Sequence, residues 1–127
     1  MAKFLKFWLP VIAWMGLIFY LSSIPDLKSN LPAIWDLILR KIAHILEFYI
    51  LFLLFTRALD WPKKLRPRRT SLWLEKLFWD VIFSIIYAFS DEYHQKFVHE
   101  RGCSLKDVGF DTIGVLFGYF VSGRTTK

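Results

Sequence analysis

Four long apolar segments divide the chain, and they constrain its fold more than any other feature. A helix needs about 20 mostly apolar residues to cross the hydrocarbon core of a membrane. Such segments are expected at about residues 4–23, 42–59, 72–89 and 105–121. The 127 residues are 55% hydrophobic, which excludes disorder and leaves room for one domain. We therefore predict an all-α, polytopic membrane protein, with four transmembrane helices in a bundle and a single domain over residues 1–127.

The first segment shares the basic start of a secretory signal, because Lys3 and Lys6 precede its apolar run. The run is long for a signal, and no small-residue cleavage site follows Ser22 and Ser23. We expect a retained membrane anchor.

A basic loop between the second and third segments predicts the orientation. Residues 60–71 hold five Lys and Arg residues, and Pro62 and Pro67 end any helix there. Basic loops favour the cytoplasmic side of a membrane. With this loop inside, both termini are cytoplasmic and 11 of the 17 Lys and Arg residues lie on the inner side. The outer loops are then residues 24–40 and 90–104.

The net charge of +6 indicates an anionic binding partner, either a nucleic acid or an anionic lipid. Its concentration between two predicted spans favours lipid headgroups. We expect membrane lipids as partners and no nucleic acid. The single cysteine, Cys103, excludes an internal disulfide framework and a four-thiolate zinc site.

Polar residues gather at the outer ends of the predicted spans, where all three histidines and eight of the eleven acidic residues fall. In the second span Lys41, His44 and Glu47 are three residues apart, a spacing that places them in one polar stripe of a helix. Ionisable groups within a membrane are functional candidates by default.

A second polar group follows the third span. Asp91, Glu92, His94 and Gln95 lie close together, and the spacing of three and four puts Asp91, His94 and Gln95 on one face if the helix continues. Within the third span, Asp80 follows Lys76 by one turn, which favours a structural ion pair over a proton relay.

The fourth span carries a stripe of acidic and small residues. Asp107, Asp111, Gly114 and Gly118 are separated by four, three and four residues and share one face. A Gly-x-x-x-Gly pair allows close approach of another helix, so Asp111 should face the bundle and find a partner there. Ser104 also begins a helix-capping pattern with Asp107, which is the structural alternative for both residues.

These polar motifs occur in a fixed order along the chain. They are Lys41-x-x-His44, then Asp91-Glu92-x-His94-Gln95, then Arg101, Ser104, Asp107 and Asp111. In combination they resemble the VanZ-like family of small bacterial integral membrane proteins. The resemblance implies a multi-pass protein of the bacterial cytoplasmic (inner) membrane and, from the founding member, an association with low-level resistance to teicoplanin-type glycopeptide antibiotics. It implies no established reaction.

One functional hypothesis is an enzyme at the outer face that acts on a cell-wall precursor, a lipid headgroup or a lipophilic glycopeptide. A histidine would be the general base, and a glutamate would orient it or act as the acid. The candidate catalytic residues are His44, Glu47, Glu92 and His94. The candidate substrate-binding residues are Lys41, Asp91, Gln95, Arg101, Ser104, Asp107 and Asp111.

Two non-enzymatic hypotheses stay open beside it: a module that binds or shields an anionic envelope component, and a purely structural polar network. A metal site built from His44-x-x-Glu47 and Asp91-x-x-His94 is a further variant. The positive charges of Lys41 and Arg101 disfavour a cation there, so no metal and no other cofactor is expected. The sequence leaves the substrate and the oligomeric state open.

Overall fold

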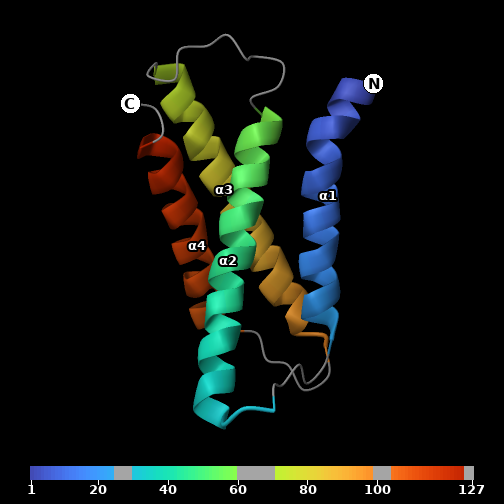
Figure 1. Cartoon of the computed structure of the whole chain (residues 1–127), viewed down its shortest axis with the longest axis vertical. Coiled ribbons are helices and arrows are strands. Elements are labelled where there is room, and N and C mark those ends of the chain that lie inside the picture. The colour runs from blue at the N-terminus through green and yellow to red at the C-terminus, as the bar shows by residue number, and fades with distance from the viewer. Residues whose placement is uncertain (25–29, 60–70, 99–103, 125–127) are drawn as a thin grey trace.

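The computed structural model of the chain is a bundle of four helices (Figure 1). It describes residues 1–24, 30–59, 71–98 and 104–124. The helices are α1 (Ala2–Ser23), α2 (Ala33–Leu59), α3 (Ser71–Gln95) and α4 (Leu105–Arg124). Within the described residues every regular element is a helix, which confirms the all-α prediction.

Consecutive helices run in opposite directions (Figure 1). Both α2 and α3 contact all the other helices, whereas the described parts of α1 and α4 do not contact each other. The start of α1 and the end of α4 lie at one end of the bundle. The end of α1, the start of α2, the end of α3 and the start of α4 lie at the other end. Residues that are far apart in sequence therefore meet at that second end.

The second helix corrects the predicted loop over residues 24–40, because α2 begins at Ala33 rather than near residue 42. The backbone carbonyl of Pro32 accepts hydrogen bonds from Trp35 and Asp36 at 3.0 and 3.1 Å, and so closes the first turn. Arg40 then pairs with Asp36 one turn earlier at 2.7 Å. Charged residues interrupt an apolar segment, but they do not end a helix when opposite charges lie four residues apart and form an ion pair.

The third helix corrects the other predicted outer loop, since α3 continues through Ser90 to Gln95. The stretch contains no Gly or Pro to interrupt it. The side-chain amide of Gln95 also donates to Asp91 one turn earlier at 3.0 Å. The conditional expectation that Asp91, His94 and Gln95 share a helix is thereby confirmed.

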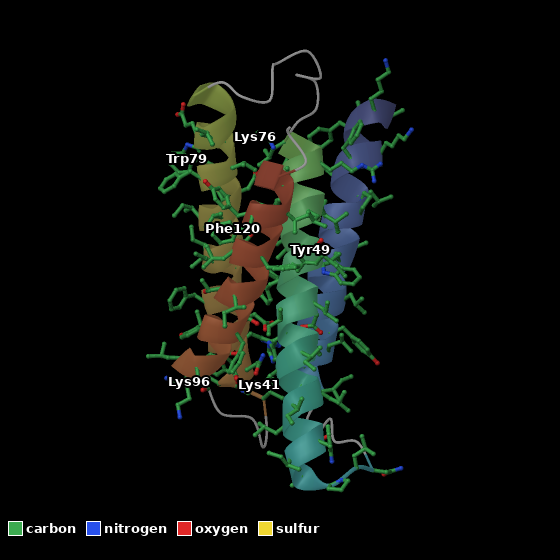
Figure 2. All side chains as sticks on the ribbon, turned by 60° about the vertical axis from the view of Figure 1, so that its left-hand side comes forward. Lys41, Tyr49, Lys76, Trp79, Lys96 and Phe120 are labelled. Atoms are coloured by element: carbon green, nitrogen blue, oxygen red, sulfur yellow. The ribbon has the colours of Figure 1, made fainter. Side chains whose placement is uncertain are left out.

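The bundle has an apolar core that includes Ile18, Phe48 and Phe52, but its surface and its buried polar groups differ from those of most soluble bundles. Large apolar residues lie exposed along all four helices, among them Trp79 and Phe120, which point away from the bundle (Figure 2). Carboxylates lie inside it, and Asp80 and Asp111 are both 0% exposed. By length and composition, α1 is the one helix of the described residues that meets the requirement for a membrane span.

The α2–α4 interface depends on the small residues predicted in the fourth span. A Cβ atom placed on Gly114 would lie 2.2 Å from the backbone oxygen of Ile45, and one on Gly118 would lie 2.6 Å from the Phe52 ring. The two backbones therefore approach as closely as a Gly-x-x-x-Gly face allows. This approach brings the polar turns of α2 and α4 together.

Candidate functional site

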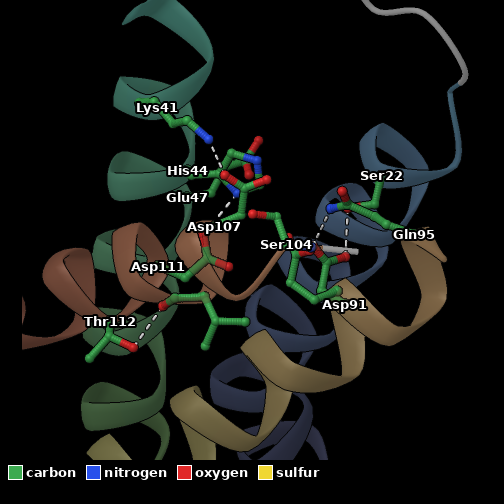
Figure 3. Close-up of polar contacts among 12 residues, drawn as sticks. Ser22, Lys41, His44, Glu47, Asp91, Gln95, Ser104, Asp107, Asp111 and Thr112 are labelled. Carbon is green, nitrogen blue, oxygen red and sulfur yellow. Dashed lines mark hydrogen bonds and ion pairs between the residues drawn. The ribbon is translucent and has the colours of Figure 1, made fainter. Parts of the chain in front are cut away.

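Two contacts join the polar stripe of α2 to that of α4. The Lys41 ammonium forms an ion pair with Asp107. One turn deeper, His44 Nδ1 lies 2.8 Å from Asp111 Oδ1. Figure 3 shows Lys41 and His44 pointing toward the two aspartates. The predicted inward orientation of Asp111 is confirmed, and its partner is His44.

Glu92 brings a third helix to this place. Its Oε2 atom accepts a hydrogen bond from the backbone N–H of Ser104, the residue before α4, at 3.0 Å. One donor atom from each of His44, Glu92 and Asp111 lies within 4.8 Å of the other two. We call these three residues the three-helix site. Glu92 is 1% exposed and Asp111 0%, so both carboxyl groups are buried, whereas the His44 side chain is 15% exposed.

The carboxyl group of Glu92 is electrostatically perturbed. Burial raises the pKa of Glu92 to about 7, and the nearby Asp107 and Asp111 act in the same direction. The Ser104 N–H opposes this change because it stabilises the ionised form. Glu92 follows Phe89, the expected end of the third span, and both its protonated and its ionised form are accessible near neutral pH.

A separate polar cluster links α1 to α3. Asp91 accepts hydrogen bonds from the Ser22 hydroxyl at 2.6 Å and from the Gln95 amide at 3.0 Å. Burial raises the pKa of Asp91, and these two hydrogen bonds oppose the rise. Three buried polar side chains thus satisfy one another between two helices.

His94 belongs to this second cluster. Its Nε2 atom lies 2.9 Å from the Ser23 hydroxyl, and its ring stacks on Phe19 with centroids 4.1 Å apart. The one hydroxyl proton of Ser23 is donated to the carbonyl of Phe19 at 2.7 Å. His94 is therefore the donor to Ser23. We call Ser22, Ser23, Asp91, His94 and Gln95 the α1–α3 cluster.

The other predicted site residues surround these clusters or lie outside them. Glu47 lies beside His44 in Figure 3, and its backbone carbonyl accepts a hydrogen bond from the Trp14 indole at 2.9 Å. The Lys41 ammonium lies 5.0 Å from the centroid of the Phe110 ring. Arg101, together with Cys103, lies outside the described residues.

The structure thus divides the predicted residues between two clusters. The sequence analysis does not predict the contribution of α1, because it considers Ser22 and Ser23 only in relation to signal cleavage. A usable signal was present. Two adjacent hydroxyl groups end the first apolar segment, on the same predicted side of the membrane as the acidic end of the third segment. No local sequence pattern indicates that the Glu92 side chain lies near His44 and Asp111 and not with Asp91 and His94.

The arrangement suits proton transfer. A carboxylate at Nδ1 of a histidine fixes the ring and favours one tautomer, so that Nε2 is left to exchange a proton. Glu92 supplies a second group that can give or accept a proton within the same site.

Comparison with known proteins gives the family. The sequence profile described as VanZ/LLP1 matches residues 7–123, which cover nearly the whole chain. The chain belongs to the VanZ/LLP1 family. This agrees with the resemblance of its motifs, and every described residue of the two clusters lies within the matched VanZ/LLP1 region. Family membership and the apolar helix α1 together indicate association with a membrane. No match to a curated protein or to a solved structure was found.

Proposed function

We propose that this VanZ/LLP1 protein crosses the bacterial cytoplasmic membrane four times and carries an acid–base site at its outer face. The site would act on the anionic headgroup of a lipid-linked envelope molecule, such as a cell-wall precursor. The observation that carries this proposal is the convergence of His44, Glu92 and Asp111 from three helices at one buried point.

The exterior of the bundle supports four spans. Exposed large apolar side chains occur on each helix, as Leu9, Ile38, Phe83 and Phe117 illustrate. Water would penalise this surface, whereas lipid tails would not. The buried carboxylates of α3 and α4 lower the hydropathy of those helices without facing lipid.

The chain's topology supports an outer location for the site. The three-helix site lies one turn from Lys41, and Figure 2 places Lys41 in the half of the bundle away from the start of α1 and the end of α4. If the basic residues between α2 and α3 hold that connection in the cytoplasm, the site faces the opposite compartment.

In the reaction we propose, water hydrolyses an ester of the headgroup. His44, oriented by Asp111, takes a proton from the water molecule, and the water oxygen bonds to the phosphorus or carbonyl carbon. Protonated Glu92 gives its proton to the departing oxygen. Lys41, already near this point, would hold an anionic oxygen of the substrate.

The test uses the full chain in detergent with a lipid-linked peptidoglycan precursor and, separately, teicoplanin. We expect the precursor to raise the melting temperature of the wild type, and mass spectrometry to detect its hydrolysis. His44→Gln should abolish turnover while the protein still folds and binds. Lys41→Ala should weaken binding at least tenfold, whereas Lys96→Ala, which alters an exposed lysine at the same end, should leave it unchanged.

Other results would select the alternatives. Binding of the precursor without turnover, only weakened by His44→Gln, would identify a binding or shielding module. A lower melting temperature in His44→Gln, with no ligand that stabilises the wild type, would leave the polar residues a structural role alone.

The proposed topology makes a separate prediction. In a Cys103→Ser background, a cysteine introduced by Lys96→Cys should react with a membrane-impermeant maleimide on intact cells. One introduced by Lys3→Cys, at the opposite end, should react only after the cells are permeabilised. The reverse pattern would place the site in the cytoplasm and exclude an extracytoplasmic substrate.

A further inference from the structure

The three-helix site presents the donor set of a metal ion. His44 offers a ring nitrogen, and Glu92 and Asp111 each offer a carboxylate oxygen, with the three atoms within 4.8 Å of one another. They come from α2, α3 and α4, so no single helix could supply the set. Sites in helical bundles combine inward-facing carboxylates and histidines in this way.

Two carboxylate oxygens of this site have no hydrogen-bond donor among the described residues. Glu92 Oε1 and Asp111 Oδ2 are fully buried and accept no hydrogen bond from the described residues. Their residues are 1% and 0% exposed. A buried acceptor without a partner is unfavourable, and two adjacent carboxylates add repulsion to that cost. A cation between them would satisfy both oxygens.

The remaining contacts would hold the carboxylates in place for a cation. The second oxygen of Glu92 is fixed by the Ser104 N–H at 3.0 Å. Such outer hydrogen bonds orient metal ligands and are part of most protein metal sites.

Of the two charges that counted against a metal in the sequence, the structure describes Lys41 and shows it compensated. Lys41 is paired with Asp107 rather than directed at the three-helix site. The three-helix site itself then combines two carboxyl groups with one imidazole and contains no ammonium or guanidinium group among its three residues.

We propose that His44, Glu92 and Asp111 bind one divalent first-row transition metal ion, with Zn²⁺ as the best match. An imidazole ligand favours zinc over calcium and magnesium, which prefer oxygen alone, and the two carboxylates would also accept manganese. Three protein ligands leave further positions for water or a substrate oxygen, as in catalytic zinc sites. Ligand atoms around tetrahedral zinc are about 3.3 Å apart, so binding would draw the three side chains together.

This inference deepens the proposed function, and it rests on the three-helix site being the functional one. With an ion bound, His44 is a ligand and the metal takes over the activation of water. The site, its location and its substrate class would be unchanged.

The experiment measures metal binding by the full chain in detergent, after chelation and dialysis. We expect one Zn²⁺ per chain by elemental analysis and competition from Mn²⁺, with no binding of Mg²⁺ or Ca²⁺. Co²⁺ should give the visible absorption of a site with a nitrogen ligand. Glu92→Gln and Asp111→Asn should each weaken Zn²⁺ binding at least 100-fold. Asp91→Asn, which removes the neighbouring buried acid of the α1–α3 cluster but no proposed ligand, should weaken Zn²⁺ binding less than tenfold.

The outcomes separate this inference from the proposed function. Absence of saturable Zn²⁺ and Mn²⁺ binding by the wild type, or equal affinity in Glu92→Gln and Asp91→Asn, overturns the metal site. Turnover by such a metal-free protein would still support acid–base chemistry by His44. A site that binds zinc in a protein that neither binds nor converts the precursor would support the metal inference and reject the proposed substrate.

Discussion

Replacing Gly114 with alanine is expected to destabilise the bundle by about 3 kcal/mol, the upper range for overpacking a tight interface. The added Cβ would lie 2.2 Å from the carbonyl oxygen of Ile45 and 3.0 Å from its carbonyl carbon. These are backbone atoms of α2, and they cannot rotate away as the end of a side chain would. The two helices would have to separate, and the contacts of Lys41 and His44 with α4 would lengthen with them.

The matched control is Gly109→Ala, one and a half turns earlier in the same helix. A Cβ there meets nothing within 4 Å. The substitution should leave stability unchanged or raise it by up to about 1 kcal/mol, because alanine has the higher helix propensity. Thermal unfolding of both variants in one detergent makes the comparison. Equal melting temperatures would show that α2 and α4 are not as closely packed as described.

Replacing Asp80 with leucine is expected to cost about 3 kcal/mol, the lower range for breaking a buried ion pair. Asp80 is 0% exposed and accepts hydrogen bonds from the Thr56 hydroxyl at 3.0 Å and the Lys76 ammonium at 3.2 Å. Lys76 also donates to the backbone carbonyl of Thr56 at 2.9 Å. Without the carboxylate, the ammonium would lose its ion pair with Asp80 and keep its hydrogen bond to the Thr56 carbonyl.

The double variant Asp80→Leu/Lys76→Met tests this explanation. It removes both charges, so it should recover much of the stability lost by Asp80→Leu alone, as is common when a buried pair is replaced by apolar residues. Lys76 and Lys41 lie at opposite ends of the bundle (Figure 2). Precursor and Zn²⁺ binding should therefore be unchanged in both variants below their melting temperatures. Additive losses in the double variant would show that the two side chains do not stabilise each other.

The stripe on the fourth helix was predictable from the sequence. Residues at spacings of three and four share a helix face whatever surrounds the helix. The pattern from Asp107 to Gly118 therefore indicated both the packing face and the inward direction of Asp111. The helices α2 and α3 extend beyond the apolar segments at residues 42–59 and 72–89 for a related reason. Hydropathy locates the apolar part of a helix, whereas hydrogen bonding and the absence of Gly and Pro decide where the helix stops.

By itself, the sequence determined four helices, their order and the polar face of each, because these follow from local spacing and from the apolar length of each segment. The tertiary structure decided which faces meet. It paired His44 with Asp111, added Glu92 to them, and turned Asp91 and His94 toward Ser22 and Ser23 of α1. Those choices depend on the relative rotation and axial position of packed helices, and neighbouring residues on one helix do not encode either quantity.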